Sequence, residues 1–300
     1  MSKQILVIGG TRLFGVRLVL RLLDAGHRVT IATRGGASDP FGDRVRRIVV
    51  DRGDRDAMTA AFAGGADYDV VYDQVCYRAS DAAISIAVFA GRVRRYVMAS
   101  TIEVYRERYG ELARPFVEDD AVVDGAAPAL DEADYAVGKR GAEARFARDA
   151  AFPVVRVRIG HVLAGPEDFT GRLASYVQTV RDGAALRHAA SAAPTSFIGV
   201  DGISELLAWV GDQHFVGALN AASHAWSAVE LHRRIAALLG RPARVEPVAC
   251  PVEPAQLSPF DYASPYQMNT ARTLALGHRF ATDDGWLDDA IRRHAAALAR

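Results

Sequence analysis

The residues of this chain best suited to chemistry are a tyrosine and a lysine four positions apart, Tyr135 and Lys139. On a helix the two side chains would lie on one face, one turn apart. An ammonium group beside a phenol stabilises the phenolate, so Lys139 would lower the pKa of Tyr135 from its usual value of about 10. The spacing therefore indicates a proton-transfer device, with Tyr135 as the acid or base and Lys139 as its support.

Chance accounts poorly for this spacing. The chain has ten tyrosines but only two lysines, Lys3 and Lys139, so a tyrosine followed by a lysine at the fourth position is expected only about 0.07 times. The alternative is a surface pair on an exposed helix face. Thr101, which follows an apolar run, could supply a third catalytic group, because its hydroxyl could hydrogen-bond a substrate carbonyl.

A glycine turn near the start of the chain indicates a phosphate-binding site. An apolar, β-branched run ends at Gly9, and apolar residues at helical spacing follow the turn. Glycines let a phosphate approach the backbone closely, and the start of the following helix attracts negative charge. The natural ligand is the pyrophosphate of a dinucleotide, although similar turns occur in proteins that bind none. The expected contacts in this turn are Gly9, Gly10, Thr11, Arg12, Leu13, Phe14 and Gly15.

Two arginines favour NADP over NAD as the dinucleotide. Arg12 stands where the usual fingerprint has glycine, and a guanidinium beside such a turn can bind phosphate. Arg34 follows the second expected strand, where the chain would face the adenosine ribose. An arginine there suits a 2′-phosphate, whereas a carboxylate would suit a free 2′-hydroxyl. The alternative for Arg34 is a solvated side chain in an arginine-rich protein, so NAD remains an option.

The elements that must position these residues alternate between strand and helix patterns. The sequence predicts strands at 3–8, 28–32, 45–50, 68–73, 95–99 and 152–159, with helices between them. This alternation is typical of an α/β protein with a doubly wound parallel sheet, the Rossmann fold. After the sixth strand we expect the chain to leave the sheet and to return at 195–200 and 217–221.

The ends of the strands supply the remaining cofactor candidates, because ligands of such sheets bind at the carboxyl ends of the strands. Asp51 follows the third strand, where the adenine amino group could be recognised. His161 follows the sixth strand. The other residues that we assign to the cofactor on this basis are Arg52, Gln74, Val75, Ser100, Tyr135 and Lys139.

A smaller C-terminal region is expected to bind the substrate. The dinucleotide-binding core would span 1–162, with returning strands at about 192–222, and the substrate-binding region would span 163–191 and 223–300. A solvated surface position is the alternative for any single polar residue of this region. The substrate candidates are Tyr77, Glu103, His161, Asp168 and Arg172.

Composition and charge argue against several classes of function. Lys+Arg and Asp+Glu are equal at 36 each, so no long-range field recruits nucleic acid or an anionic membrane. The apolar runs are too short for a secretory signal or a spanning helix, and we expect a cytoplasmic protein. Cys76 and Cys250 form neither a disulfide framework nor a metal-binding pattern, so no metal is expected.

The ordered motifs resemble the short-chain dehydrogenase/reductase superfamily, and more narrowly its extended or atypical members of the NAD-dependent epimerase/dehydratase type. Besides the glycine turn, these motifs are Ser100-Thr101…Val104-Tyr105, Tyr135-x-x-x-Lys139, Gly165-Pro166-Glu167-Asp168 and Phe197-Ile198-Gly199-Val200-Asp201. The resemblance implies that Thr101 is the catalytic hydroxyl, Tyr135 the acid/base, and Lys139 both its partner and a ribose ligand. Arg12 resembles the Gly-Gly-Thr-Arg subgroup, which includes chloroplast stem-loop RNA-binding relatives and many bacterial reductases.

The sequence predicts an NADP-dependent enzyme that reduces a ketone on a small biosynthetic substrate, a nucleotide-linked keto-sugar or a natural-product ketone. Hydride would come from the nicotinamide and the proton from Tyr135. One alternative is a nucleotide-sugar epimerase or dehydratase that recycles bound NAD. Another is a non-catalytic nucleotide- or RNA-binding relative, against which the zero net charge and the Tyr–Lys pair both argue. We expect no nucleic-acid or membrane partner, and a homodimer is allowed.

Overall fold

The structure is a computed structural model that describes residues 1–65, 67–121, 123, 134–248 and 258–299. Within these residues the centre is a seven-stranded parallel sheet with the order β10-β6-β5-β4-β1-β2-β3. The strands are β1 (Gln4–Ile8), β2 (Arg28–Thr33), β3 (Val45–Val49), β4 (Val70–Asp73), β5 (Tyr96–Thr101), β6 (Val154–Ile159) and β10 (Gly217–Ala221). The strand order reverses between β1 and β4, which is where doubly wound sheets bind their ligands. The predicted fold class is confirmed.

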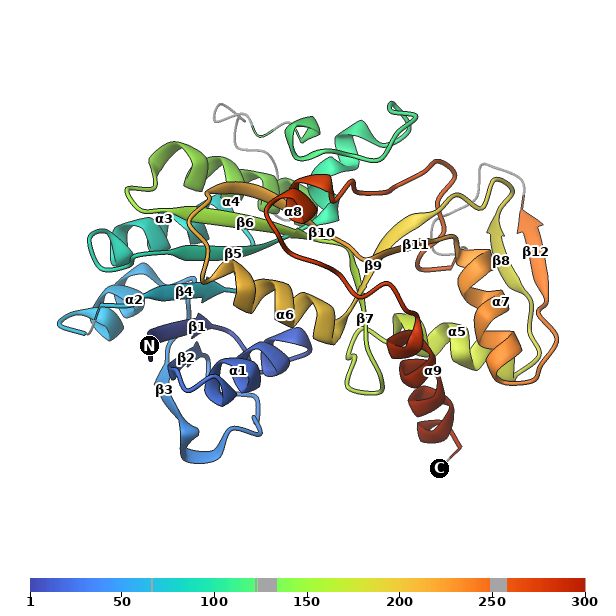
Figure 1. Ribbon diagram of the computed structural model, residues 1–300, viewed down its shortest axis with the longest axis horizontal. Helices are drawn as coiled ribbons and strands as arrows, with labels where there is room; N and C mark the ends of the chain where they lie inside the picture. The colour runs from blue at the N-terminus through green and yellow to red at the C-terminus, as the bar shows by residue number, and fades with distance from the viewer. Residues whose placement is uncertain (66, 122, 124–133, 249–257, 300) are drawn as a thin grey trace.

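Helices cover both faces of this sheet (Figure 1). One face carries α1 (Phe14–Asp24) and α6 (Val200–Val210), and the other carries α2 (Arg55–Phe62), α3 (Ala79–Phe89) and α4 (Tyr135–Asp149). Alternate side chains of β1 enter the two cores: Ile5 and Val7 pack on the α1 side, Leu6 and Ile8 on the α2 side. Burial on both faces explains why the strands are continuously apolar.

The remaining elements form a smaller region at the other end of the molecule, where the chain also ends (Figure 1). Its strands are β7 (His161–Leu163), β8 (Leu186–Ala189), β9 (Thr195–Gly199), β11 (His224–Trp226) and β12 (Val245–Val248), and its helices are α5 (Arg172–Arg181), α7 (Ala228–Leu238) and α9 (Gly285–Ala297). The three helices share one apolar core. The short helices elsewhere are η1 (Gly42–Arg44), η2 (Ile102–Arg108), η3 (Glu118–Asp120) and α8 (Ala271–Ala275).

The strand at 195–199 does not rejoin the parallel sheet, so the prediction for this segment is wrong. β9 pairs in parallel with β7 and antiparallel with β11, in a separate three-stranded sheet. The departure point is Gly160, where a Cβ would lie 2.9 Å from the Ser196 carbonyl oxygen. Only glycine allows the two backbone segments to cross this closely. The prediction for 217–221 is confirmed, because β10 pairs with β6.

Asp134 sets the start of α4. Its carboxylate accepts a hydrogen bond of 3.0 Å from a first-turn N–H group, so it is the N-cap. The helix therefore begins at Tyr135. Asp54 and Ser227 cap α2 and α7 in the same way.

Two further properties concern membranes and metals. Among the described residues, every helix is too short or too polar to cross a bilayer. The same residues contain no group of three or more His, Cys, Asp or Glu side chains that could hold a metal ion. Cys76 is buried, and Cys250 lies outside the described residues.

Candidate active site

The turn between β1 and α1 is shaped for the close approach of a ligand. Gly9 and Gly10 have φ values of +95° and +88°, which L side chains rarely adopt. A Cβ at Gly15 would lie 2.9 Å from the Gly10 Cα atom of the backbone, so only glycine fits there. α1 has no side-chain cap at its N-terminus. The N–H groups of Gly15 and Val16 bond to the Arg12 and Leu13 carbonyls, which leaves the Phe14 N–H of the first turn to meet an anion.

Two further features of this turn fit a ligand rich in acceptor oxygens. Leu13 has φ +46° and ψ −129°, a conformation that costs a non-glycine residue about 1–3 kcal/mol and that occurs preferentially at functional sites. The Nε2 atom of Gln74 is buried and has no hydrogen-bond partner within the described part of the chain. A buried donor of this kind requires an acceptor. The residues present therefore fit the pyrophosphate of a dinucleotide.

Three predicted cofactor residues are exposed at this end of the sheet. Arg34 and Asp51 follow β2 and β3, and Arg12 lies in the turn after β1. The Arg12 guanidinium lies 5.3 Å from the centre of the Phe169 ring, which belongs to the segment before α5 and is 64% exposed. Since β1, β2 and β3 are neighbours in the sheet, these side chains extend from one edge of the fold.

Arg52 lies in a buried ion-pair cluster. Its guanidinium contacts the Asp73 carboxylate, the Ser85 hydroxyl at 3.0 Å and the Asp81 carboxylate at 3.3 Å. Asp73 also accepts a hydrogen bond of 2.6 Å from the Tyr96 hydroxyl. The cluster joins the ends of β3 and β4 to α3. This geometry disfavours the predicted cofactor contact, because it leaves no free guanidinium at the surface.

The other strand-end residues divide into two groups. Gln74 and Val75 lie against the glycine turn, and the nearest Val75 methyl group would be 3.3 Å from a Cβ at Gly9. Ser100 is buried and donates its hydroxyl hydrogen bond to Glu143 of α4. Gln74 and Val75 are thus placed where a cofactor would meet them, whereas Ser100 belongs to the packing beneath α4.

Thr101, Tyr135 and Lys139 come together at the carboxyl end of β5. Thr101 is the last residue of the strand, and its hydroxyl hydrogen-bonds the Tyr135 side chain. Lys139 is only 2% exposed. Its ammonium donates a hydrogen bond of 2.8 Å to the Ala99 carbonyl and lies 5.8 Å from the centre of the Tyr135 ring. Tyr135 is 48% exposed, so part of its ring stays accessible.

The pKa of Tyr135 in the structure differs from the value expected from the sequence. Desolvation raises the pKa of Tyr135 to about 12, and the hydrogen bond with Thr101 is the main influence that lowers it. Burial lowers the pKa of Lys139, because an ammonium group is costly to desolvate. The prediction that Lys139 brings the phenol pKa below 10 is wrong for this structure, since the ammonium is directed at the Ala99 carbonyl instead.

Three predicted substrate residues surround Tyr135. Glu103 of η2 raises the pKa of Tyr135 and Arg172 of α5 lowers it, so both charges act on this hydroxyl. Desolvation raises the pKa of Glu103 itself, against the attraction of Arg106 and Arg172. The centre of the Tyr77 ring lies 6.2 Å from that of Tyr135. A carboxylate and a guanidinium therefore act electrostatically on Tyr135, and a second phenol ring packs beside it.

His161 and Asp168 are both buried. The Nε2 atom of His161 lies 3.0 Å from the Tyr262 hydroxyl, and the two rings stack. Burial lowers the pKa of His161 to about 3, so the imidazole is neutral at physiological pH. Asp168 accepts a hydrogen bond from the Thr170 N–H group, and its second oxygen has no partner among the described residues. His161 can therefore offer a neutral hydrogen-bonding group to a ligand, but it cannot carry a positive charge at physiological pH.

The sequence did not predict a buried network beneath α4. Glu143, one turn beyond Lys139, binds the Arg158 guanidinium of β6 at 2.6 to 3.2 Å. Arg158 also donates to the Tyr105 hydroxyl at 2.9 Å, and Tyr105 donates to Asn220 at 2.7 Å. The available signal is the presence of two arginines, Arg156 and Arg158, in an apolar strand, because a buried arginine needs a charged partner.

A parallel sheet with a glycine turn at its switch point, and with a tyrosine–lysine helix beside it, defines a dinucleotide-dependent α/β enzyme. The chain belongs to the NAD dependent epimerase/dehydratase family, whose model matches residues 5–192. It is 31% identical over 271 residues to the 2'-dehydrokanamycin reductase of Streptomyces kanamyceticus, an alignment that covers 83% of this chain and 70% of that protein.

Two other similarities complete the comparison. The chloroplast stem-loop binding protein of 41 kDa b from Arabidopsis thaliana is 31% identical over 134 residues, 40% of this chain and 34% of that protein. The fold matches the UDP-glucose 4-epimerase of Thermus thermophilus, solved in complex with NAD, with a TM-score of 0.69, 16% identity, and coverage of 98% of this chain and 99% of that one. The family and the reductase relative identify the chain as an NAD(P)-dependent enzyme of the extended short-chain dehydrogenase/reductase type.

Proposed function

We propose that the protein is an NADP-dependent reductase of a ketone on a small biosynthetic substrate, a nucleotide-linked keto-sugar or a natural-product ketone. The observation that carries this proposal is the hydrogen-bonded pair of Thr101 and Tyr135 with Lys139 buried beside it. The relative named as a reductase supports net reduction. Placement in the Gly-Gly-Thr-Arg subgroup stays a prediction.

The three side chains have separate tasks in this mechanism. A reduced nicotinamide held across the strand ends would supply hydride to the carbonyl carbon. Thr101 orients the carbonyl oxygen toward Tyr135, which donates its proton to that oxygen as negative charge develops there. Lys139, desolvated and fixed on the Ala99 carbonyl, would hold the ribose of the cofactor, the second role that the family resemblance implies for it. The pKa of about 12 keeps the proton on Tyr135 before the reaction, which suits an acid and therefore the reductive direction.

The cofactor would lie across the carboxyl ends of β1 to β5. Gly9, Gly10 and the uncapped start of α1 would hold the pyrophosphate. The exposed guanidinium groups of Arg12 and Arg34 support a 2′-phosphate and hence NADP. The domain division predicted from the sequence stays a prediction. In the proposed arrangement the elements after β6 would supply Arg172 and His161 to the substrate side.

An epimerase or dehydratase that recycles bound NAD is the second candidate. The family description and the fold shared with an NAD-bound 4-epimerase favour it. Such an enzyme must first withdraw a proton with Tyr135, so the tyrosine would act as a base before it acts as an acid. An RNA-binding role has less support, because the match to the stem-loop binding protein covers only 40% of the chain and the net charge is zero.

The test begins with the purified protein. Any nucleotide that copurifies is identified, and NADPH and NADH are then titrated in parallel before candidate ketones are screened for NADPH consumption. We expect exchangeable binding with NADPH preferred, together with net oxidation of NADPH by at least one ketone. Tightly bound NAD that survives purification, with sugar conversion but no net change in its redox state, would establish the epimerase or dehydratase instead.

A further inference from the structure

Tyr77 lies beside the catalytic residues, yet the proposed reaction gives it no task. It belongs to the segment between β4 and α3, and its backbone N–H donates a hydrogen bond of 2.8 Å to the Asp81 carboxylate. Asp81 is itself paired with the buried Arg52. The backbone of Tyr77 is therefore fixed by the same ion-pair cluster that joins β3 and β4 to α3.

The Tyr77 ring lies under the Lys139 ammonium. The Nζ atom is 4.7 Å from the centre of this ring, closer than the 5.8 Å to the Tyr135 ring. Lys139 is almost fully buried, and among the described residues its ammonium has no ion-pair partner; its hydrogen bond goes to the neutral Ala99 carbonyl. Asp73 and Glu143 act on this charge only from beyond ion-pair distance. A buried cation of this kind gains further compensation from the face of an aromatic ring.

The attraction comes from the ring rather than from a charged oxygen. Desolvation raises the pKa of Tyr77, so its phenol is neutral over the working pH range. Tyr77 and Tyr135 also pack against each other at 6.2 Å with planes tilted by 52°. The ammonium of Lys139 thus lies between two aromatic rings and one carbonyl oxygen, and each of these limits its position.

We propose that Tyr77 is a positioning residue: its ring holds the Lys139 ammonium beside Tyr135 and covers it from water. This role replaces the substrate contact predicted for Tyr77 from the sequence. The effect on turnover rests on the proposed reductase function, whereas the contact itself can be tested without any substrate. Because the ring acts, Tyr77→Phe should preserve the role and Tyr77→Leu should remove it.

The composition of the chain makes this contact directly measurable. With only two lysines, Lys3 and Lys139, protein grown on isotopically labelled lysine gives two sets of Cε–Hε signals by NMR. Lys3 bonds to Asp212 and the Gly211 carbonyl, so its signal is an internal reference, assigned with Lys3→Arg. Ring currents should shift the Lys139 Hε signal upfield in the wild type and in Tyr77→Phe. In Tyr77→Leu most of this shift should disappear, and an unchanged shift would overturn the proposal.

Turnover and cofactor binding test the consequence of the contact. Tyr77→Leu should lower kcat about tenfold with a smaller change in KM for the ketone, whereas Tyr77→Phe should stay within about threefold. If the ring-current shift is lost but kcat equals that of Tyr77→Phe, the ring positions nothing. A loss in Tyr77→Phe as large as in Tyr77→Leu would assign the role to the hydroxyl and overturn this one.

Two controls separate other causes of failure. If the wild type reduces no ketone, the proposed function fails, and the NMR shift together with NADPH affinity decides about Tyr77. Tyr77→Leu should then bind NADPH about fivefold more weakly than Tyr77→Phe, and equal affinities would contradict the positioning role. Thermal unfolding of both variants checks the fold, and Tyr77→Met replaces the leucine variant if that one does not fold.

Discussion

Arg158 and Glu143 form an ion pair whose closest nitrogen and oxygen are 2.6 Å apart, with side-chain exposures of 2% and 0%. The pair joins β6 to α4, one helical turn beyond Lys139. Desolvation opposes the charge on Glu143, but Arg158 above all, with help from Arg156 and Ser100, holds the pKa of Glu143 below its ordinary value. The helix that carries Tyr135 and Lys139 is therefore fixed to the sheet by a charged pair as well as by apolar packing.

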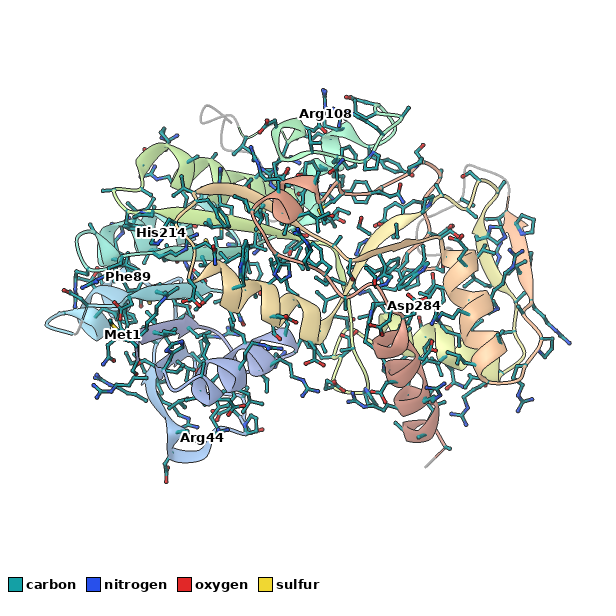
Figure 2. The ribbon with its side chains drawn as sticks, in the orientation of Figure 1. Met1, Arg44, Phe89, Arg108, His214 and Asp284 are labelled. Carbon is teal, nitrogen blue, oxygen red and sulfur yellow. The ribbon has the colours of Figure 1, made fainter. Side chains whose placement is uncertain are left out.

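Breaking this pair should destabilise the protein strongly. Arg158→Met leaves the Glu143 carboxylate buried and uncompensated, and we expect it to lower the free energy of unfolding in urea by about 3–5 kcal/mol. The matched control is Arg44→Met, which removes an exposed ion pair with Asp24 at the periphery (Figure 2). That change should cost less than about 1 kcal/mol. Equal losses in the two variants would show that burial of the pair has no special importance.

Removing the Tyr135 hydroxyl should abolish turnover without abolishing cofactor binding. Tyr135→Phe keeps the ring but loses the proton that the mechanism delivers to the carbonyl oxygen, so kcat should fall by about 10²- to 10⁴-fold. NADPH affinity, measured by fluorescence titration, should change by less than about threefold. Tyr109→Phe, which removes a hydroxyl that accepts a hydrogen bond from the Ser264 N–H, is the control. Substantial turnover in Tyr135→Phe would eliminate this tyrosine as the proton donor.

Arg34 should discriminate between the two nicotinamide cofactors. Arg34→Ala removes a guanidinium from the carboxyl end of β2, and we expect it to weaken NADPH binding about tenfold or more while NADH changes little. Arg28→Ala removes an exposed arginine from the opposite end of the same strand and should affect neither cofactor. Parallel titrations of both cofactors check this result. Equal losses for NADPH and NADH in Arg34→Ala would mean that Arg34 does not contact the 2′-phosphate.

Local sequence signals were sufficient for most of the fold and for selecting Thr101, Tyr135 and Lys139, which the structure brings together. The alternation of apolar runs and helical patterns predicts which segments of the chain become parallel strands and which become helices. The Asp134 cap places Tyr135 in the first turn of α4. The glycine turn is equally local, because Gly9 and Gly10 need only their own positive φ values. Periodicity and capping depend on residues a few positions apart, so they can be read without knowing the tertiary structure.

Contacts between distant segments could not be predicted in this way. The pattern of 195–199 indicates a strand but not its partner, which is β7 rather than the central sheet. The sequence does not show which carboxylates pair with Arg52 and Arg158, because those carboxylates lie 21 and 15 positions away. The direction of the Lys139 ammonium depends on Ala99, 40 positions earlier. These errors share one cause: the identity of a buried charge's partner is a property of the tertiary fold.

His161 makes the stability of the protein depend on pH with a definite sign. Burial lowers its pKa to about 3 in the folded protein, whereas an unfolded histidine has a pKa of about 6.5. Between these values the unfolded chain binds a proton that the folded chain does not, so acidification favours unfolding. The contribution is fully present above pH 6.5 and is lost progressively below it. By pH 5 the loss of unfolding free energy from this group amounts to roughly 2 kcal/mol, at 1.36 kcal/mol per pH unit.

His161→Gln should remove this dependence while keeping a polar group that can bond the Tyr262 hydroxyl. The variant will be less stable than the wild type near pH 7.5, but the difference in unfolding free energy between the two proteins should narrow by roughly 2 kcal/mol as the pH falls to 5. His214→Gln, at an exposed position (Figure 2), should run parallel to the wild type. Urea unfolding at pH 5, 6, 7 and 8 measures all three proteins. If the gap between His161→Gln and the wild type stays constant, His161 takes up its proton as readily in the folded chain as in the unfolded one, and the neutral imidazole that we place beside the substrate is wrong.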